Sequence, residues 1–175
     1  MDWDAIENEL IQDVRQAFDH LQILTVHEQL YALCLSVSEN GMGIGLNANT
    51  DSFLNQKLSE ERAIEEITLQ DESYFRWSSA EWRFEGVGDE FFQTLNNALT
   101  EVLLRGEQQE PSFEKLIDAM IEALRHLRDA RGHALKGVTL FVTITDSDEA
   151  EAIENRSAAD LNAPDVAQAF ISRFG

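Results

Sequence analysis

The sequence predicts an α+β fold, in which several helices pack on a small, mostly antiparallel sheet within a single domain spanning residues 1–175. Three observations support this prediction. Apolar residues recur at spacings of three and four in several segments, which is typical of helices that bury one face. Two short apolar segments flank a run of turn residues and predict a β-hairpin. A later segment rich in β-branched residues predicts one more strand.

The first third of the chain is expected to form a helix, a hairpin and a second helix. Residues 2–20 have the apolar spacing of an amphipathic helix, with acids in its first turn. The sequence Asn-Gly-Met-Gly at residues 40–43 supplies the turn between a strand over 29–38 and another over 44–49. Thr50 then caps a helix, because its hydroxyl can accept a hydrogen bond from a free amide of the first turn.

The middle of the chain contains one segment without a periodic apolar pattern, followed by two segments with the apolar spacing of helices. Residues 70–88 crowd aromatic side chains without helical or strand spacing, so we expect a loop with a short strand near residues 82–84. Residues 91–103 and 113–127 have regular apolar spacing and predict two helices. Pro111 suits the first turn of the second helix, where a missing amide proton costs little.

The last part of the chain predicts a strand and further helices. Residues 138–145 alternate in the manner of a strand, and Phe141 indicates that both of its faces are partly covered. Asp146 and Glu149 have the spacing of a helix cap and its third-position acid, so a short helix is expected to start there. Pro164 is expected to open the last helix.

Charge is the most informative property for function. The chain holds 33 Asp and Glu against 13 Lys and Arg, a formal net charge of −20. This sign repels nucleic acid and anionic membranes, and it favours basic proteins or cations. The apolar fraction of 43% argues against a disordered acidic chain. We therefore expect a folded protein whose partner is basic, with no nucleic acid and no membrane among its partners.

The termini and the cysteine content indicate a cytoplasmic protein. The first ten residues are acidic and lack the positive flank and apolar run of a signal peptide. No stretch approaches the roughly 20 apolar residues of a membrane span. Cys34 is the only cysteine, so an intrachain disulfide cannot form, and its leucine neighbours predict a buried, inert thiol.

Two tryptophans near a carboxylate form the first candidate site. Trp77, Glu81 and Trp82 lie together in the sequence RWSSAEWRF. Aromatic faces attract cations, and Trp is enriched in binding hot spots, so these residues are candidates to line a pocket for a cationic or planar ligand. The alternative is that both indoles fill the core while Glu81 pairs with Arg76 or Arg83.

A second candidate site follows the late strand. Asp146 and Asp148 stand at alternate positions, where carboxylates can supply oxygen ligands to Mg²⁺ or Ca²⁺. The glycine that the common calcium loop needs for its turn is missing, and acids near a helix start are favoured by the helix dipole without any metal. No cofactor is otherwise indicated.

Acidic segments are the candidate faces for a basic partner. Residues 51–72 hold seven acids against Lys57 and Arg62. The glutamates of this segment chosen as candidate binding residues are Glu60, Glu61, Glu65 and Glu66. Residues 125–136 run against the overall charge with four cations, which the dipole at a helix C-terminus explains; a local anion site is the alternative.

Short motifs give the chain a family resemblance. They are Leu30-Tyr31-Ala32-Leu33, Ala48-Asn49-Thr50 and Trp77-Ser78-Ser79-Ala80-Glu81-Trp82. On these motifs, its length and its late strand followed by Asp146, the chain resembles the bacterial family known as domain of unknown function 4303. The resemblance covers nearly the whole chain and implies a cytosolic bacterial domain. It implies no catalytic residue set, and kinship of fold would not fix the function.

Three functions compete at this point. The leading hypothesis is a non-enzymatic acidic domain that captures a basic protein, as an immunity protein neutralising a toxin such as a nuclease, because charge complementarity speeds association and disfavours wrong partners. The alternative is a small-ligand or divalent-metal-dependent enzyme with a pocket lined by Trp77 and Glu81, although no catalytic motif is found. The third is an acidic surface adapted to high salt.

Overall fold

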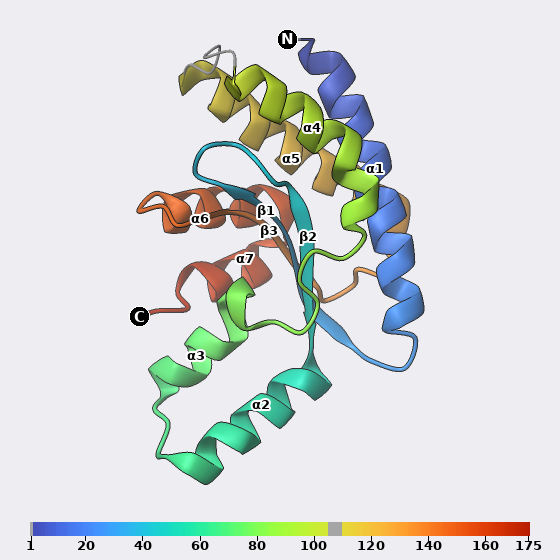
Figure 1. Cartoon of the computed structure of the whole chain (residues 1–175). Helices are drawn as coiled ribbons and strands as arrows, with labels where there is room; N and C mark the ends of the chain where they lie inside the picture. Colours follow the sequence, from blue (N-terminus) through green and yellow to red (C-terminus); the bar gives the residue numbers. More distant parts are fainter. Residues whose placement is uncertain (1, 105–109) are drawn as a thin grey trace.

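The computed structural model describes residues 2–104 and 110–175 and contains one three-stranded sheet with helices on both faces (Figure 1). The strands are β1 (Leu30–Ser38), β2 (Gly45–Thr50) and β3 (Thr139–Thr145), in the order β2-β1-β3. β1 and β2 form the expected antiparallel hairpin, whereas β3 pairs with β1 in parallel. The α+β class is confirmed, and the sheet is mixed because the long connection from β2 returns the chain to the starting end of β1.

Alternation along the strands divides the core between the two faces. Leu33 and Leu35 point with Leu140 and Val142 into the larger cluster. Helices α1 (Trp3–Leu24), α4 (Asp89–Leu104) and α5 (Glu110–Arg131) cover this face. Residues of opposite parity enter the smaller cluster, as the two-residue period of a strand requires. Both faces of β3 are therefore covered, as the sequence predicts.

The smaller cluster is aromatic and lies on the other face of the sheet. Cys34 and Phe141 project into it from β1 and β3. Helices α6 (Ala150–Leu161) and α7 (Pro164–Ile171) contribute Ala158 and Phe170, and α2 (Asp51–Ile64) contributes Leu54. Cys34 is fully buried, as the sequence predicts, and burial raises the pKa of its thiol.

Capping residues mark several helix starts, and the sequence placed Thr50 and Pro164 correctly at two of them. Asp2 caps α1 by accepting a hydrogen bond from the amide of Ala5 at 3.2 Å. Thr50 caps α2 through the amide of Phe53 at 3.3 Å, and Pro164 is the first residue of α7. Each cap satisfies or avoids a free amide of the first turn, which is why these residue types mark helix starts.

Three local predictions differ from the structure. Residues 69–77 form the helix α3 (Leu69–Trp77) instead of a loop, because Thr68 and Asp71 make a reciprocal capping box. The segment then makes a short 3-10 turn, η1 (Ser79–Glu81), and the expected strand near residues 82–84 is reduced to a single bridge between Ala48 and Phe84. Asp146 does not cap α6: it lies in a turn with a φ of 60°, and the helix begins at Ala150.

Side chains of α6 protect the outer edge of β3. Asn162 accepts hydrogen bonds from the Leu140 amide and from Arg128 Nη2, both at 2.9 Å, and donates to the carbonyls of Leu140 and Ala158 at 2.7 and 2.8 Å. Ser157 accepts from the amide of Val142 at 2.9 Å. Free amides and carbonyls on an edge strand invite pairing with another chain, and these bonds occupy them.

Replacing Asn162 by Ala should lower the free energy of unfolding by about 2–3 kcal/mol. The substitution removes the hydrogen bonds that Asn162 makes to the Leu140 amide, the Leu140 carbonyl and the Arg128 guanidinium. Chemical denaturation measures the change. Asn155→Ala offers a comparison on the same helix, since Asn155 accepts one bond, from Arg173. A smaller loss for Asn162→Ala than for Asn155→Ala would contradict this account of the edge.

The length and apolar content of a helix decide whether it can cross a membrane. Across residues 2–104 and 110–175, the structure contains no helix with the length and apolar character needed to cross a bilayer.

Candidate functional site

The two candidate tryptophans pack around Tyr31 at the start of β1. The rings of Trp77 and Trp82 meet the Tyr31 ring edge-on, with centroids 5.9 and 6.4 Å away. Trp82 is 5% exposed and also contacts Phe141, while Trp77 contacts Phe170 at 5.0 Å. Edge-to-face contacts of this kind stabilise a core, so most of both indole surfaces is used inside the protein.

Hydrogen bonds lock this aromatic cluster in place. The Tyr31 hydroxyl and the Trp82 indole N–H both donate to the carbonyl of Arg76, at 2.7 and 3.0 Å. Burial raises the pKa of the Tyr31 hydroxyl far above its usual range. Glu81 lies outside the cluster, 3.5 Å from Lys57 Nζ, and does not pair with Arg76 or Arg83. The structure thus puts the two indoles together but directs the carboxylate elsewhere.

The second candidate site lies at the other end of the sheet. Asp146 follows Thr145, which pairs with Ser38 at the end of β1, whereas the tryptophans surround Tyr31 at its start. Seven residues of strand separate these ends by about 23 Å, at roughly 3.3 Å per residue. Within the part of the chain that the structure describes, no three His, Cys, Asp or Glu side chains gather closely enough to hold a metal ion. Asp146 and Asp148 are both exposed.

The four candidate glutamates belong to a projecting helical pair, which we call the arm (residues 51–77, comprising α2, α3 and the turn between them). Glu61 pairs with Lys57 at 3.0 Å, and Glu60 accepts a hydrogen bond from Gln56. Glu65 and Glu66 lie in the exposed turn, and neither forms an ion pair with a residue in 2–104 or 110–175. The acids thus gather where the arm is farthest from the sheet (Figure 1).

The basic residues at the end of α5 are used inside the protein. Arg125 pairs with Glu122, and Arg131 makes two hydrogen bonds to Asp19 at 3.0 and 2.8 Å. Arg128 donates to the carbonyl of Val138 and to Asn162, both at 2.9 Å. These contacts account for three of the four cations at residues 125–136 without an anion.

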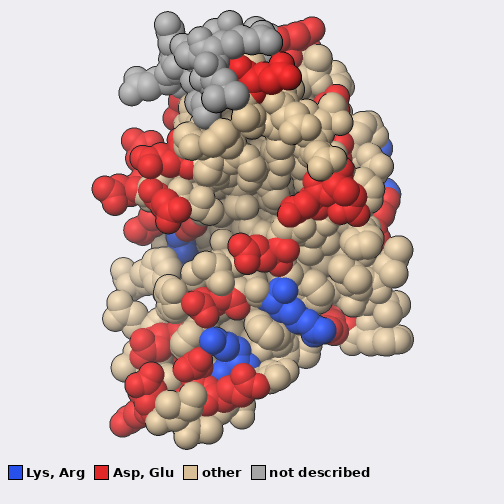
Figure 2. Space-filling view, viewed as in Figure 1, with Lys and Arg blue, Asp and Glu red and all other residues tan. Residues whose placement is uncertain are grey.

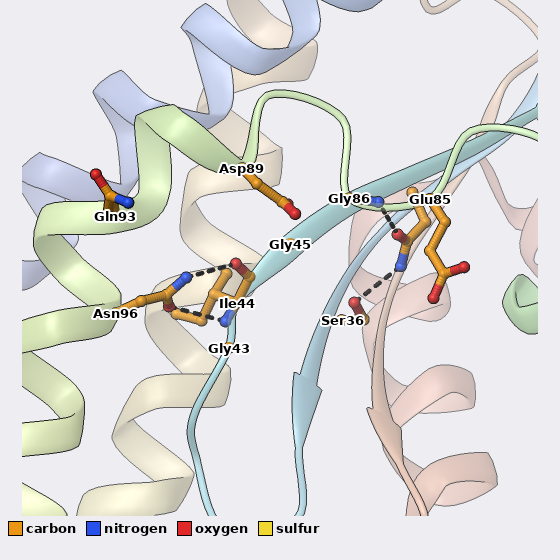
Figure 3. Close-up of a pocket in the computed structure, with 10 residues that line it drawn as sticks. Ser36, Gly43, Ile44, Gly45, Glu85, Gly86, Asp89, Gln93 and Asn96 are labelled. Carbon is orange, nitrogen blue, oxygen red and sulfur yellow. Dashed lines mark hydrogen bonds between the residues drawn. The ribbon is translucent and has the colours of Figure 1, made fainter.

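A groove that several distant segments form was missed in the sequence. It lies between the β-hairpin and the start of α4, has a volume of about 520 Å³, and is lined by Ser36, Gly43, Ile44, Gly45, Asn47, Glu85, Gly86, Asp89, Gln93 and Asn96 (Figure 3). Glycines form part of its wall, so the backbone of the hairpin is open to the groove. Polar residues in an otherwise apolar hairpin, such as Ser36 and Asn47, were the available signal.

Two asparagines hold the groove in shape. Asn96 on α4 accepts from the amide of Ile44 at 2.8 Å and donates to its carbonyl at 3.0 Å. Asn47 accepts from the amide of Gly86 and donates to the Ser36 hydroxyl, both at 2.8 Å. These bonds tie the hairpin to α4 and to the preceding loop, so the groove is built by contacts between segments distant in sequence.

The groove is acidic. The Asp89 carboxylate reaches across from α4 toward Gly45 and Gly86 (Figure 3). Partial burial raises the pKa of Asp89, and the charges of Glu90 and Glu85 raise it further. None of the lining residues is Lys or Arg. A cation entering the groove would therefore meet carboxylates that no Lys or Arg of the groove lining pairs with.

Comparison with known proteins identifies the family. The chain matches the family described as Domain of unknown function (DUF4303) over residues 10–163 of 175, and it belongs to this family. No curated protein and no solved structure matches the chain.

Proposed function

We propose that this member of the DUF4303 family is a non-enzymatic acidic domain that captures a basic protein in the cytoplasm, as an immunity protein neutralises a toxin such as a nuclease. The observation that supports the proposal is the imbalance between paired cations and free carboxylates. Among the residues that the structure describes, seven cations pair with carboxylates: Lys57, Arg62, Arg83, Arg125, Arg131, Arg156 and Arg173. The carboxylates in excess are left to attract a basic partner.

Exposed acids lie on both the arm and the groove. Figure 2 shows acidic residues spread over one face of the molecule, with few basic residues between them. Glu65 and Glu66 on the arm, and Glu85 and Asp89 at the groove, have no ion pair within the described chain. A surface potential of one sign accelerates the approach of an oppositely charged protein and disfavours acidic competitors.

The first test is capture of a partner from the native host by the tagged protein at low salt, followed by elution at high salt and mass spectrometry. The proposal requires a basic protein that is released by salt. The purified pair should then show an association rate that falls at least tenfold between about 0.05 and about 0.5 M salt, since added ions screen exposed charges. A partner without net positive charge, or an association rate insensitive to salt, would refute the proposal.

Paired neutralising variants locate the charges that matter. Glu85→Gln with Asp89→Asn removes two charges at the groove, and Asp146→Asn with Asp148→Asn removes two charges beyond β3. Both changes alter the net charge equally. We expect the groove variant to lower the affinity for the captured partner several-fold more, because its carboxylates converge on one hollow. Equal losses would mean that only the total charge acts.

A further inference from the structure

The end of the arm carries exposed aliphatic side chains among its acids. We call residues 60–69 the arm tip. Ile64 and Leu69 are 79% and 84% exposed, although both are large and apolar. Between them Ile67 turns inward and packs against the aromatic cluster. The folded chain thus partly buries one of the three large aliphatic residues and leaves the other two in solvent.

Local contacts hold the arm tip in its shape. Arg62 on α2 pairs with Glu72 on α3, and the capping box of Thr68 and Asp71 starts α3 immediately after the turn. Leu54 and Leu58 are the residues of α2 that are buried, so the helix leaves the core before its last turns. The exposed aliphatic residues therefore sit on an ordered projection with a hollow of about 460 Å³ beside Ile64 and Ile67.

The charge around the arm tip indicates which class of partner can bind there. Residues 51–72 hold seven acids and two cations, a net charge of 2 − 7 = −5, and both cations already pair with acids of the same chain. A second copy would bring the same acids against themselves, and an anionic membrane would be repelled. A basic surface with an apolar centre would satisfy both the glutamates and the aliphatic pair.

We propose that the arm tip is the docking surface for the basic partner, and that it binds a cationic amphipathic helix whose aliphatic face covers Ile64 and Leu69 while its Lys or Arg residues meet Glu65 and Glu66. This inference rests on the proposed function and adds to the groove a second part of the surface that contributes to the affinity. Apolar contacts at the centre of an interface supply most of the binding energy, while charges at the rim set the rate and the specificity.

The test uses a synthetic helical peptide with Lys on one face and Leu on the other, titrated against the full chain by calorimetry. The control peptide has the same composition in scrambled order, so it keeps the charge and loses the apolar face. We expect wild-type protein to bind the amphipathic peptide at least tenfold more tightly than the scrambled one. Equal affinities would overturn the inference, because charge alone would then explain binding.

Matched variants of the protein locate the contact. Ile64→Ser with Leu69→Ser should weaken binding of the amphipathic peptide at least tenfold. Ile23→Ser with Val26→Ser removes two aliphatic side chains that are 72% and 70% exposed beyond the arm, and it should leave the affinity unchanged. Circular dichroism confirms folding of both variants. Equal affinity of the two variants would overturn the inference.

Further outcomes separate this inference from the proposed function. If the partner captured from the host binds both double variants equally, the arm tip is excluded while the proposed function stands. If no basic partner is captured at all, the proposed function fails. Sedimentation of wild-type protein with vesicles of anionic phospholipid, or dimerisation that is lost in the Ile64→Ser, Leu69→Ser variant, would assign the aliphatic pair to another occupant and overturn the inference.

Discussion

Replacing Arg173 by Met should lower the free energy of unfolding by about 3–5 kcal/mol at pH 8, because it leaves a buried carboxylate without its cation. The Arg173 side chain is 1% exposed and its Nη2 lies 2.5 Å from Glu154 Oε2. Its Nη1 donates to Asn155 and to the carbonyl of Phe170, and its own carbonyl accepts a hydrogen bond from Ser73. The guanidinium therefore joins α7 to α6 beside the aromatic cluster.

The effect should depend on pH in a defined direction. Burial raises the pKa of Glu154, whereas the Thr143 hydroxyl and Arg173 act to lower it. Without Arg173 the pKa of Glu154 rises further, so the variant binds a proton on folding. Its stability deficit should then shrink as the pH falls from 8 toward 5, since the protonated carboxyl no longer needs a cation. Denaturant titrations at several pH values measure the deficit.

Two further variants test the cause. Arg156→Met also removes a cation paired with acids, at 3.2 Å from Glu114 and 3.3 Å from Asp118, but that side chain is 42% exposed. Exposed pairs contribute little, so this control should cost less than about 1 kcal/mol. Adding Glu154→Gln to Arg173→Met should recover part of the loss. A deficit that is independent of pH and not relieved by Glu154→Gln would show that lost packing, and not charge, dominates.

Replacing Asp13 by Asn should stabilise the protein at pH 8, by at most about 3 kcal/mol. Asp13 lies among the core residues of α1, is 6% exposed, and its Oδ2 has no hydrogen-bond partner. Burial, and then the charge of Glu9, raise the pKa of Asp13 to about 6. A shift of about two pKa units corresponds to roughly 3 kcal/mol between the protonated and ionised forms.

The sign of the pH dependence follows from the raised pKa. Below about pH 4, which is the pKa of Asp13 in the unfolded chain, the carboxyl is protonated in both the folded and the unfolded state. The contribution of Asp13 to the free energy of unfolding is then at its maximum. This contribution is lost as the pH rises through about 6, because folding then buries a charge. The gain from Asp13→Asn should thus be absent near pH 4, grow as the pH rises toward about 6, and reach its full size above that pH. The exposed control Asp148→Asn should show no comparable step, and a step of equal size in both variants would refute this account.

Local signals in the sequence were sufficient for most elements. Asp2, Thr50 and Pro164 mark helix starts through their own hydrogen bonds or their missing amide, and these effects act within one turn. The alternation around Leu140 and Val142 likewise reflects a strand with a buried face. The helix at residues 69–77 was missed because its aromatic residues share no single buried face, and its capping box was the available signal.

The candidate site depended on distant contacts. The sequence placed Trp77, Glu81 and Trp82 side by side, yet Tyr31, Phe141 and Phe170 take up the indoles and Lys57 takes the carboxylate. Likewise the groove joins a hairpin to α4 through Asn47 and Asn96, and no local pattern reports such a junction. Proximity in sequence predicted neighbours but not which way their side chains face.

By itself, the sequence determined the α+β class, the starts of α2 and α7, the buried cysteine and the large acid excess, because propensity, periodicity and charge are properties of residues and their near neighbours. Only the tertiary structure decided that β3 pairs with β1 in parallel and that the arginines at the end of α5 bind other residues of the same chain. It also decided that Ile64 and Leu69 remain exposed among glutamates. These features depend on which distant segments pack together. Burial and pairing are therefore set by the whole fold.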